Sequence, residues 1–154
     1  SNVFSEKGVK KTIIKNILDP INVFVRENLT FMKMPFDVEL DDTFNATITQ
    51  LGEVIESETL STGEMKRINV SILLAYIKLI RTKKNINILF LDEVFASIDI
   101  EGVDDILSLL KDFANQYNIN IFVVHHAQLE TELFDRVLHM KKDVFTTIEE
   151  EIWT

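Results

Sequence analysis

The sequence predicts an α/β fold in which a largely parallel sheet is flanked by helices, with a small antiparallel β layer beside it. Two short apolar runs, 88–91 and 119–124, carry this prediction, because unbroken apolar strands covered on both faces are typical of parallel sheets. A helical pattern over 101–117 joins them and gives the strand–helix–strand order of a right-handed βαβ unit. A period of two between residues 35 and 55 predicts the antiparallel layer.

The composition is that of a globular domain rather than a disordered or membrane-spanning chain. The 154 residues can bury a core, and an apolar content of 46% excludes intrinsic disorder. The formal charge of −9 gives no sign of a broad basic DNA-binding face. The absence of cysteine fits a reducing compartment, and no apolar run approaches the roughly 20 residues of a membrane span. We therefore expect a cytoplasmic protein without a membrane partner.

The first segment, residues 5–32, has apolar residues at spacings of three and four, which predicts an amphipathic helix. Pro20 lies inside this pattern and should kink or split the helix, because proline lacks an N–H donor. Two interpretations stay open, a single helix packed on the domain or the last turns of a long coiled coil. The start Ser1-Asn2, without methionine, suggests a piece excised from a longer protein.

Next comes a predicted hairpin over 36–49, with its turn at 41–43, and a third short strand over 53–57. A helix over 61–81 follows, since Ser61 and Glu64 have the spacing of a capping box. Its apolar stripe is predicted from Ile68, Ile72, Leu73, Tyr76 and Ile80. Beyond the second apolar strand, a short helix over 128–134 and a closing hairpin over 137–148 complete the prediction.

Polar side chains stand where the two apolar strands end. Asp92 and Glu93 follow the first strand, and His125 and His126 follow the second. Ligands bind at the carboxyl ends of strands in open α/β sheets. Asp92 is therefore a candidate to hold a hydrated Mg²⁺ on a nucleotide, and Glu93 to activate the attacking water. The alternative is a pair of solvated acids at a strand end.

Four short motifs occur in a fixed order: residues 60–64 (LSTGE), 88–93 (ILFLDE), 96–99 (ASID) and 123–126 (VVHH). Together they resemble the signature motif, Walker B motif, D-loop and switch histidine of the ABC ATPases. Glu64, where transporters usually have glutamine, makes the chain similar to the SMC and SbcC-type proteins of chromosome maintenance and repair. The likeness extends to the ATPase subunits of recombination endonucleases of T-even-type phages.

The resemblance implies ATP and Mg²⁺ as cofactors, with Asp92 as the metal ligand and Glu93 as the general base. It places His126, or by a slip of one residue His125, on the γ-phosphate. Further nucleotide contacts, made across a dimer of heads, are implied for Ser61, Thr62, Gly63, Glu64, Ser97 and Asp99. A helix start suits a phosphate because its N–H groups are unpaired. The plain alternatives are a helix cap at 61–64 and a surface turn at 97–99.

One departure from the family pattern decides what the chain can do alone. No Gly-x4-Gly-Lys-Ser/Thr motif occurs, so the phosphate-cradling loop is missing. The resemblance implies that it lies in an N-terminal Walker A lobe, beyond a coiled coil. Residues 1–32 would then be the coiled-coil exit helix, and residues 33–154 the C-terminal lobe of an ATPase head. Thr62 also replaces a signature glycine.

We accordingly expect a DNA repair or recombination ATPase that regulates a nuclease subunit on DNA, and no ATP hydrolysis by this chain alone. Three alternatives stay open: a non-catalytic interaction module derived from an ATPase, a chromosome-structure SMC-like protein, and a stand-alone metal hydrolase.

Overall fold

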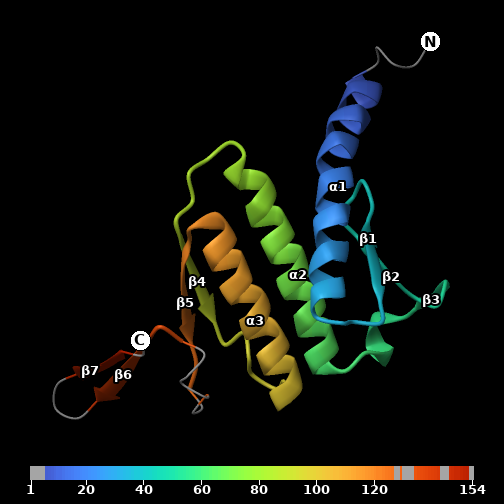
Figure 1. Cartoon of the computed structure of the whole chain (residues 1–154). Helices are drawn as coiled ribbons and strands as arrows, with labels where there is room; N and C mark the ends of the chain where they lie inside the picture. The colour runs from blue at the N-terminus through green and yellow to red at the C-terminus, as the bar shows by residue number, and fades with distance from the viewer. Residues whose placement is uncertain (1–5, 127–128, 130–133, 143–145, 153–154) are drawn as a thin grey trace.

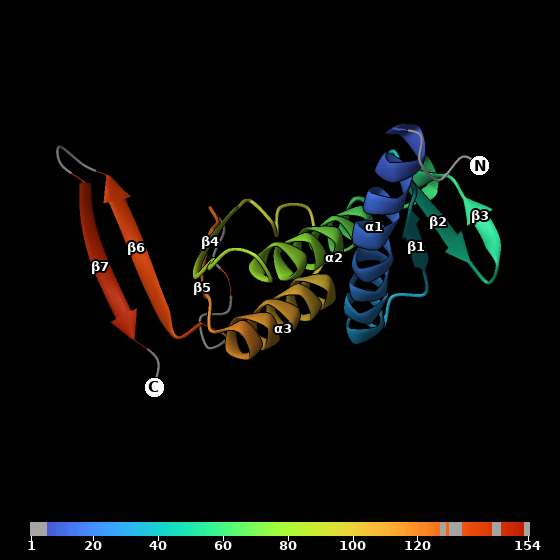
Figure 2. The same cartoon turned by 90° about the horizontal axis from the view of Figure 1, so that it is seen from above.

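The computed structural model describes residues 6–126, 129, 134–142 and 146–152, and its elements lie in layers (Figure 1). From one end to the other these are hairpin β6–β7, the parallel strands β4 and β5, helices α2 and α3, helix α1, and the antiparallel strands β1–β3 (Figure 2). The bounds are α1 Glu6–Phe31, β1 Asp37–Leu40, β2 Ala46–Gln50, β3 Glu53–Ile55, the 3₁₀ helix η1 Ser57–Thr59, α2 Thr62–Arg81, β4 Ile88–Asp92, α3 Ile100–Tyr117, β5 Asn120–Val124, β6 Arg136–Lys142 and β7 Thr146–Ile152.

Helix α1 runs through Pro20 as one helix, so the chain is not split there. Its C-terminal half is part of the core, since Leu18, Ile21, Val25 and Leu29 are each 5% exposed or less. These residues recur at spacings of three and four, which puts them on one helical face. The coiled-coil assignment of residues 1–32 stays a prediction.

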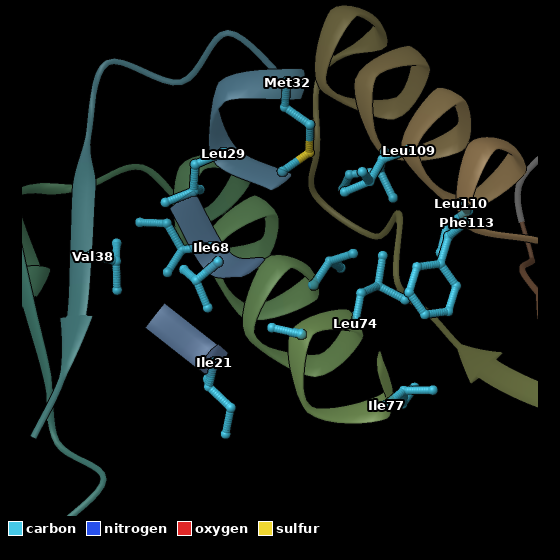
Figure 3. Packing of buried hydrophobic residues seen from close by; sticks show 14 of the residues in the cluster. Ile21, Leu29, Met32, Val38, Ile68, Leu74, Ile77, Leu109, Leu110 and Phe113 are labelled. Atoms are coloured by element: carbon cyan, nitrogen blue, oxygen red, sulfur yellow. The ribbon is translucent and has the colours of Figure 1, made fainter. Parts of the chain in front are cut away.

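Helix α2 lies between α1 and α3 and supplies the centre of the core (Figure 3). Ile68, Leu74 and Ala75 are almost completely buried. The predicted apolar stripe of α2 was partly wrong, because Leu73 is 37% and Tyr76 51% exposed. A helix that is covered on two sides buries residues on more than one face. A prediction based on a single apolar stripe therefore assigns some of its residues to the wrong side.

Hydrogen bonds of two asparagines attach α1 to its neighbours. The Asn22 amide accepts from Leu40 N at 2.9 Å and donates to Leu40 O at 3.1 Å, as a neighbouring strand would. Asn28 Nδ2 donates to Ser71 O at 2.9 Å, and Ser71 itself is fully buried. These contacts fix α1 against both the β1 edge and helix α2.

The predicted antiparallel layer is confirmed, with β1 paired to β2 and β2 to β3. The β1–β2 turn is organised by Asp41, whose Oδ1 accepts from Thr43 N, Thr43 Oγ1 and Asn45 N at 2.8, 2.7 and 2.9 Å. Leu51 and Gly52 both have positive φ, as a two-residue hairpin turn requires.

The parallel pairing of β4 with β5 is also confirmed, with Ile88 opposite Asn120 and Asp92 opposite Val124. The expectation that both faces of these strands are covered was wrong. Leu91 is buried at 6% exposure, whereas Phe90 is 69% and Phe122 43% exposed. Helix α3 packs on one face, and no described residue covers the other. We call the exposed residues Ile88, Phe90, Phe122 and Val124 the open face.

The closing hairpin is confirmed as β6–β7, longer than predicted, with Met140 opposite Ile148. It stands apart from the helical layers in Figure 2. The short helix predicted over 128–134 falls largely outside the described residues. Within the described part of the chain, no helix is both long and apolar enough to cross a membrane.

Candidate functional site

The two acids occupy the end of β4 that the sequence assigned to them. Asp92 is the last residue of the strand and is exposed. Glu93 continues the pairing by one bond, since its N–H donates to Val124 O at 3.0 Å, but its φ is +54°. This left-handed backbone is rare for a residue with a side chain and costs about 1–2 kcal/mol. The strand therefore ends sharply at Glu93, whose side chain is 39% exposed.

Both histidines after β5 approach the carboxylate of Glu93. His126 Nε2 lies 3.3 Å from Glu93 Oε1, and His125 Nδ1 lies 3.7 Å from Glu93 Oε2. The two imidazoles differ in burial, with His125 11% and His126 88% exposed. Adjacent strand residues would point to opposite faces, but β5 ends at Val124, so the histidines are free of that alternation. His125 also packs edge-on against Phe95, with ring centres 6.0 Å apart.

Two buried polar atoms of this cluster make no hydrogen bond to any described residue. They are Glu93 Oε1 and His125 Nδ1. Buried polar atoms in folded proteins are nearly always paired with protein, water or a ligand. Glu93 Oε1 has His126 Nε2 at ion-pair distance but accepts no hydrogen bond, so it suits a water molecule, and the exposed carboxylate of Asp92 suits a hydrated cation. Within the described ranges, no cluster of three or more His, Asp and Glu is arranged to hold a metal by itself.

Helix α2 begins with the predicted capping box. Ser61 Oγ accepts from Glu64 N at 3.2 Å, and Glu64 Oε2 accepts from Ser61 N and from Ser61 Oγ, both at 2.8 Å. Glu64 therefore orients Ser61, while Ser61 and Thr62 are exposed. A Cβ added to Gly63 would meet no atom closer than 3.8 Å. The fold of this chain therefore does not require glycine at position 63.

The segment after Glu93 forms a tight turn against α2. Ser97 is exposed and has a φ of +62°, and Asp99 caps α3 by accepting from Gly102 N at 3.2 Å. A Cβ on Gly102 would lie 2.6 Å from Ile98 Cγ2 and 2.7 Å from Asp99 Oδ1. Gly102 is therefore needed for the close approach of this turn to α3. The helix-cap role of Asp99 was not predicted, because α3 was expected to start at residue 101 and starts at Ile100.

Two basic residues on the second turn of α2 contact the neighbouring segments. Arg67 Nη1 forms an ion pair with Asp105 Oδ2 of α3 at 3.2 Å, and both side chains are less than a quarter exposed. Arg67 is therefore a partly buried residue that links α2 to α3. Lys66 Nζ donates to Glu93 O at 3.2 Å and to Ala96 O. Sequence reasoning missed Lys66, since no motif spacing links position 66 to residues 93 and 96.

The predicted residues thus form two groups in one chain. Glu93 and the two histidines lie together beside Asp92 at the strand ends. Ser61, Thr62 and Gly63 lie at the start of α2, whose next turn contacts the segment after Glu93 through Lys66.

Comparison with known proteins places this geometry in a family context. No protein-family model matches the chain. It is 30% identical over 146 residues to exonuclease subunit 2 of enterobacteria phage T4, covering 92% of this chain and 26% of the relative. It is 36% identical over 118 residues to the probable exonuclease subunit 2 of Escherichia phage T5, covering 75% and 18%. The chain therefore spans about a quarter or less of these relatives.

Solved structures with a similar fold include heads of SMC proteins. A structure from work on ATP-driven dimerisation of SMC ATPases has a TM-score of 0.68 at 15% identity, covering 92% of this chain and 89% of that one. An Smc head bound to the C-winged helix domain of ScpA gives 0.71 at 14%, covering 93% and 50%. The SMC head domain from Thermotoga maritima gives 0.65 at 19%, covering 93% and 51%.

The fold is therefore that of an ABC ATPase head of the SMC class. The chain is homologous to a part of exonuclease subunit 2 of phages T4 and T5.

Proposed function

We propose that this chain is the C-terminal lobe of an ATPase head that regulates a partner nuclease in DNA recombination or repair. The observation that carries the proposal is the meeting of Asp92, Glu93 and His126 at the ends of two paired parallel strands. The homology to phage exonuclease subunits supports the nuclease partner. It also favours this function over a role in chromosome structure.

Phosphoryl transfer depends on positioning and on neutralisation of charge, with little covalent chemistry for the protein to perform. Glu93, whose Oε1 accepts no hydrogen bond from a described residue, would accept a proton from the attacking water or orient it. His126 is exposed and close to Glu93, so its imidazole can reach outward to a γ-phosphate. Asp92 would hold a hydrated Mg²⁺, which supplies positive charge to the phosphates when ATP is bound.

The start of α2 would act on the ATP of a second head. Its exposed Ser61 and Thr62, and the uncrowded backbone at Gly63, can face a phosphate at the positive end of the helix dipole. Ser97 and Asp99 lie in the adjoining turn and would cross the same dimer interface. Glu64 serves this surface indirectly, by holding Ser61.

The open face supports a further part of the proposal. Ile88, Phe90, Phe122 and Val124 are each between 43% and 69% exposed on one side of the parallel strands. Central strands of an α/β sheet are normally covered on both faces. We propose that the Walker A lobe, which would carry the missing phosphate loop, covers this face. Helix α1 would lead in from the coiled coil between the two lobes.

ATP hydrolysis by the intact protein and by this chain tests the function. The intact protein should hydrolyse ATP in the presence of Mg²⁺, and the purified 154-residue chain should stay at background. Asp92→Asn should abolish hydrolysis by the intact protein, whereas the same change at the remote Asp37, in the antiparallel layer, should not.

Robust turnover by the chain alone would contradict the need for a second lobe. An intact protein that binds no nucleotide would point instead to a non-catalytic interaction module. Metal-dependent hydrolysis by the chain without nucleotide would favour the metal hydrolase.

A further inference from the structure

Lys66 sits where α2 crosses the turn formed by residues 93–99, which we call the 93–99 turn. Its side chain is partly buried, and its ammonium donates to Glu93 O at 3.2 Å and to Ala96 O. The two carbonyls belong to the first residue and the middle residue of the turn. A lysine ammonium has three donors, so one side chain can bind both carbonyls at once.

The backbone that Lys66 contacts is strained. Glu93 has a φ of +54° and Ser97, which follows Ala96, a φ of +62°. Each such residue costs about 1–2 kcal/mol relative to ordinary backbone. Strain of this kind persists only where the surroundings fix it. Besides Lys66, the turn is closed by Ala96 N donating to Glu93 O at 3.2 Å and Ile98 N to Phe95 O at 3.3 Å. Both distances are at the long end for such bonds.

We propose that Lys66 is a positioning residue that holds the 93–99 turn in its left-handed shape and thereby aims the Glu93 carboxylate. The catalytic part of this inference rests on the proposed function, in which Glu93 activates water. Lys66 also lies one turn beyond Ser61–Gly63 on helix α2. In the proposed dimer it would therefore connect the start of α2, which faces the ATP of the second head, with the Glu93 carboxylate, which serves the other ATP. No other described residue joins α2 to the Glu93 carbonyl by a hydrogen bond that the structure shows.

The test compares three variants. Lys66→Met keeps the aliphatic stem and removes the donors, while Lys66→Arg restores a cation with several donors. Lys78→Met is the matched control, because Lys78 is also a partly buried lysine of α2 and binds Glu27 Oε2 at 3.1 Å, far from the turn. Hydrogen exchange on the 154-residue chain measures how often the 93–99 turn opens. Steady-state ATP hydrolysis by the intact protein measures the effect of the turn on catalysis.

We expect exchange at the amides of Ala96 and Ile98 to be about tenfold faster in Lys66→Met, as for loss of a charged hydrogen bond. Lys66→Arg should stay within about threefold of wild type, and Lys78→Met should be unchanged at these amides. In the intact protein, Lys66→Met should lower kcat about 10- to 100-fold, as for a misplaced catalytic group, with KM for ATP within about twofold. Lys66→Arg should recover most of the kcat. If Lys66→Met does not fold, Lys66→Gln takes its place, since its shorter amide cannot span both carbonyls.

Unchanged exchange at Ala96 and Ile98 in a folded variant would overturn the inference. Faster exchange with wild-type kcat would overturn its catalytic part. If the wild-type intact protein hydrolyses no ATP, the proposed function fails, and the exchange measurement alone then decides whether Lys66 holds the turn.

Discussion

His126 Nε2 lies 3.3 Å from Glu93 Oε1, so the side chain after one parallel strand meets the side chain after its neighbour. The register brings them together, because Asp92 and Val124 are paired and are the last residues of β4 and β5. This relationship gives the first two predictions, which separate the roles of the acid and of the two imidazoles.

Replacing Glu93 by glutamine in the intact protein should lower ATP turnover by about 100-fold or more, the range expected for loss of a general base. Nucleotide binding should be retained, because the amide keeps the shape of the side chain, and a nucleotide-bound dimer of heads should accumulate. Turnover with radiolabelled ATP and size-exclusion chromatography would measure both. Glu53→Gln, in the antiparallel layer, is the control, and wild-type turnover by Glu93→Gln would end the assignment of Glu93.

The two histidines should respond differently to alanine. His126 is 88% exposed, so His126→Ala should leave the Tm of the chain within about 1 °C while lowering ATP turnover by the intact protein. His125 is 11% exposed and packs on Phe95, so His125→Ala should lower the Tm by about 2–4 °C, as for a loss near 1 kcal/mol. Differential scanning fluorimetry measures the Tm of both variants. If His125→Ala alone abolished turnover without changing Tm, the switch role would belong to His125.

Alanine at the two helix-start glycines should have opposite effects on stability. Gly102→Ala puts a Cβ 2.6 Å from Ile98 and 2.7 Å from the capping Asp99, so we expect a loss of about 1–2 kcal/mol from crowding and a weakened cap. Gly63→Ala meets nothing closer than 3.8 Å and should be neutral or stabilising by up to about 1 kcal/mol. Urea unfolding of the chain would measure both. In the intact protein, Gly63→Ala should still impair ATP turnover.

A Gly102→Ala chain as stable as wild type would show that the 93–99 turn can move away from α3. Wild-type turnover by Gly63→Ala would remove the proposed phosphate contact.

The β1–β2 turn should show an acid-dependent contribution to stability. The Thr43 hydroxyl, followed by the backbone N–H groups of Asn45 and Thr43, holds the pKa of Asp41 below its ordinary value. A lowered folded pKa means that ionised Asp41 stabilises the turn above the ordinary aspartate pKa, and that this contribution is lost as the pH falls through the folded pKa. A carboxyl-detected NMR titration should therefore give a low midpoint for Asp41, and Thr43→Val should raise it.

The control for this titration is Thr59→Val, because Thr59 Oγ1 bonds to Glu56 O in the η1 segment and not to Asp41. An Asp41 midpoint that is the same in Thr43→Val and in wild type would contradict the assigned cause.

The parts of the fold that sequence could predict depend on local patterns. The capping box at Ser61 and Glu64 needs only a spacing of three, and the βαβ order needs only two apolar runs with a helical pattern between them. The convergence of Glu93 and His126 followed from topology, since carboxyl ends of parallel strands share one edge. Their catalytic roles stay predictions.

The parts that sequence could not predict depend on contacts between distant segments. The apolar run at 88–91 shows that the strand is apolar but not which surface covers it, and Phe90 is exposed in this chain. Tyr76 was misplaced because α2 is covered from two sides. Lys66 bonds to carbonyls, which every residue has, so no residue type at 93 or 96 could reveal the contact.

The open face has one more property. Phe90 and Phe122 stack across β4 and β5 with ring centres 4.8 Å apart and an angle of 16°, an arrangement worth about 0.5–1.5 kcal/mol beyond simple burial. Each ring thus restricts the rotamers of the other while both are still in water. Phe90 and Phe122 would therefore lose little side-chain entropy when another surface docks on them. Assembly at the open face should then favour a partner surface whose shape already matches the two rings.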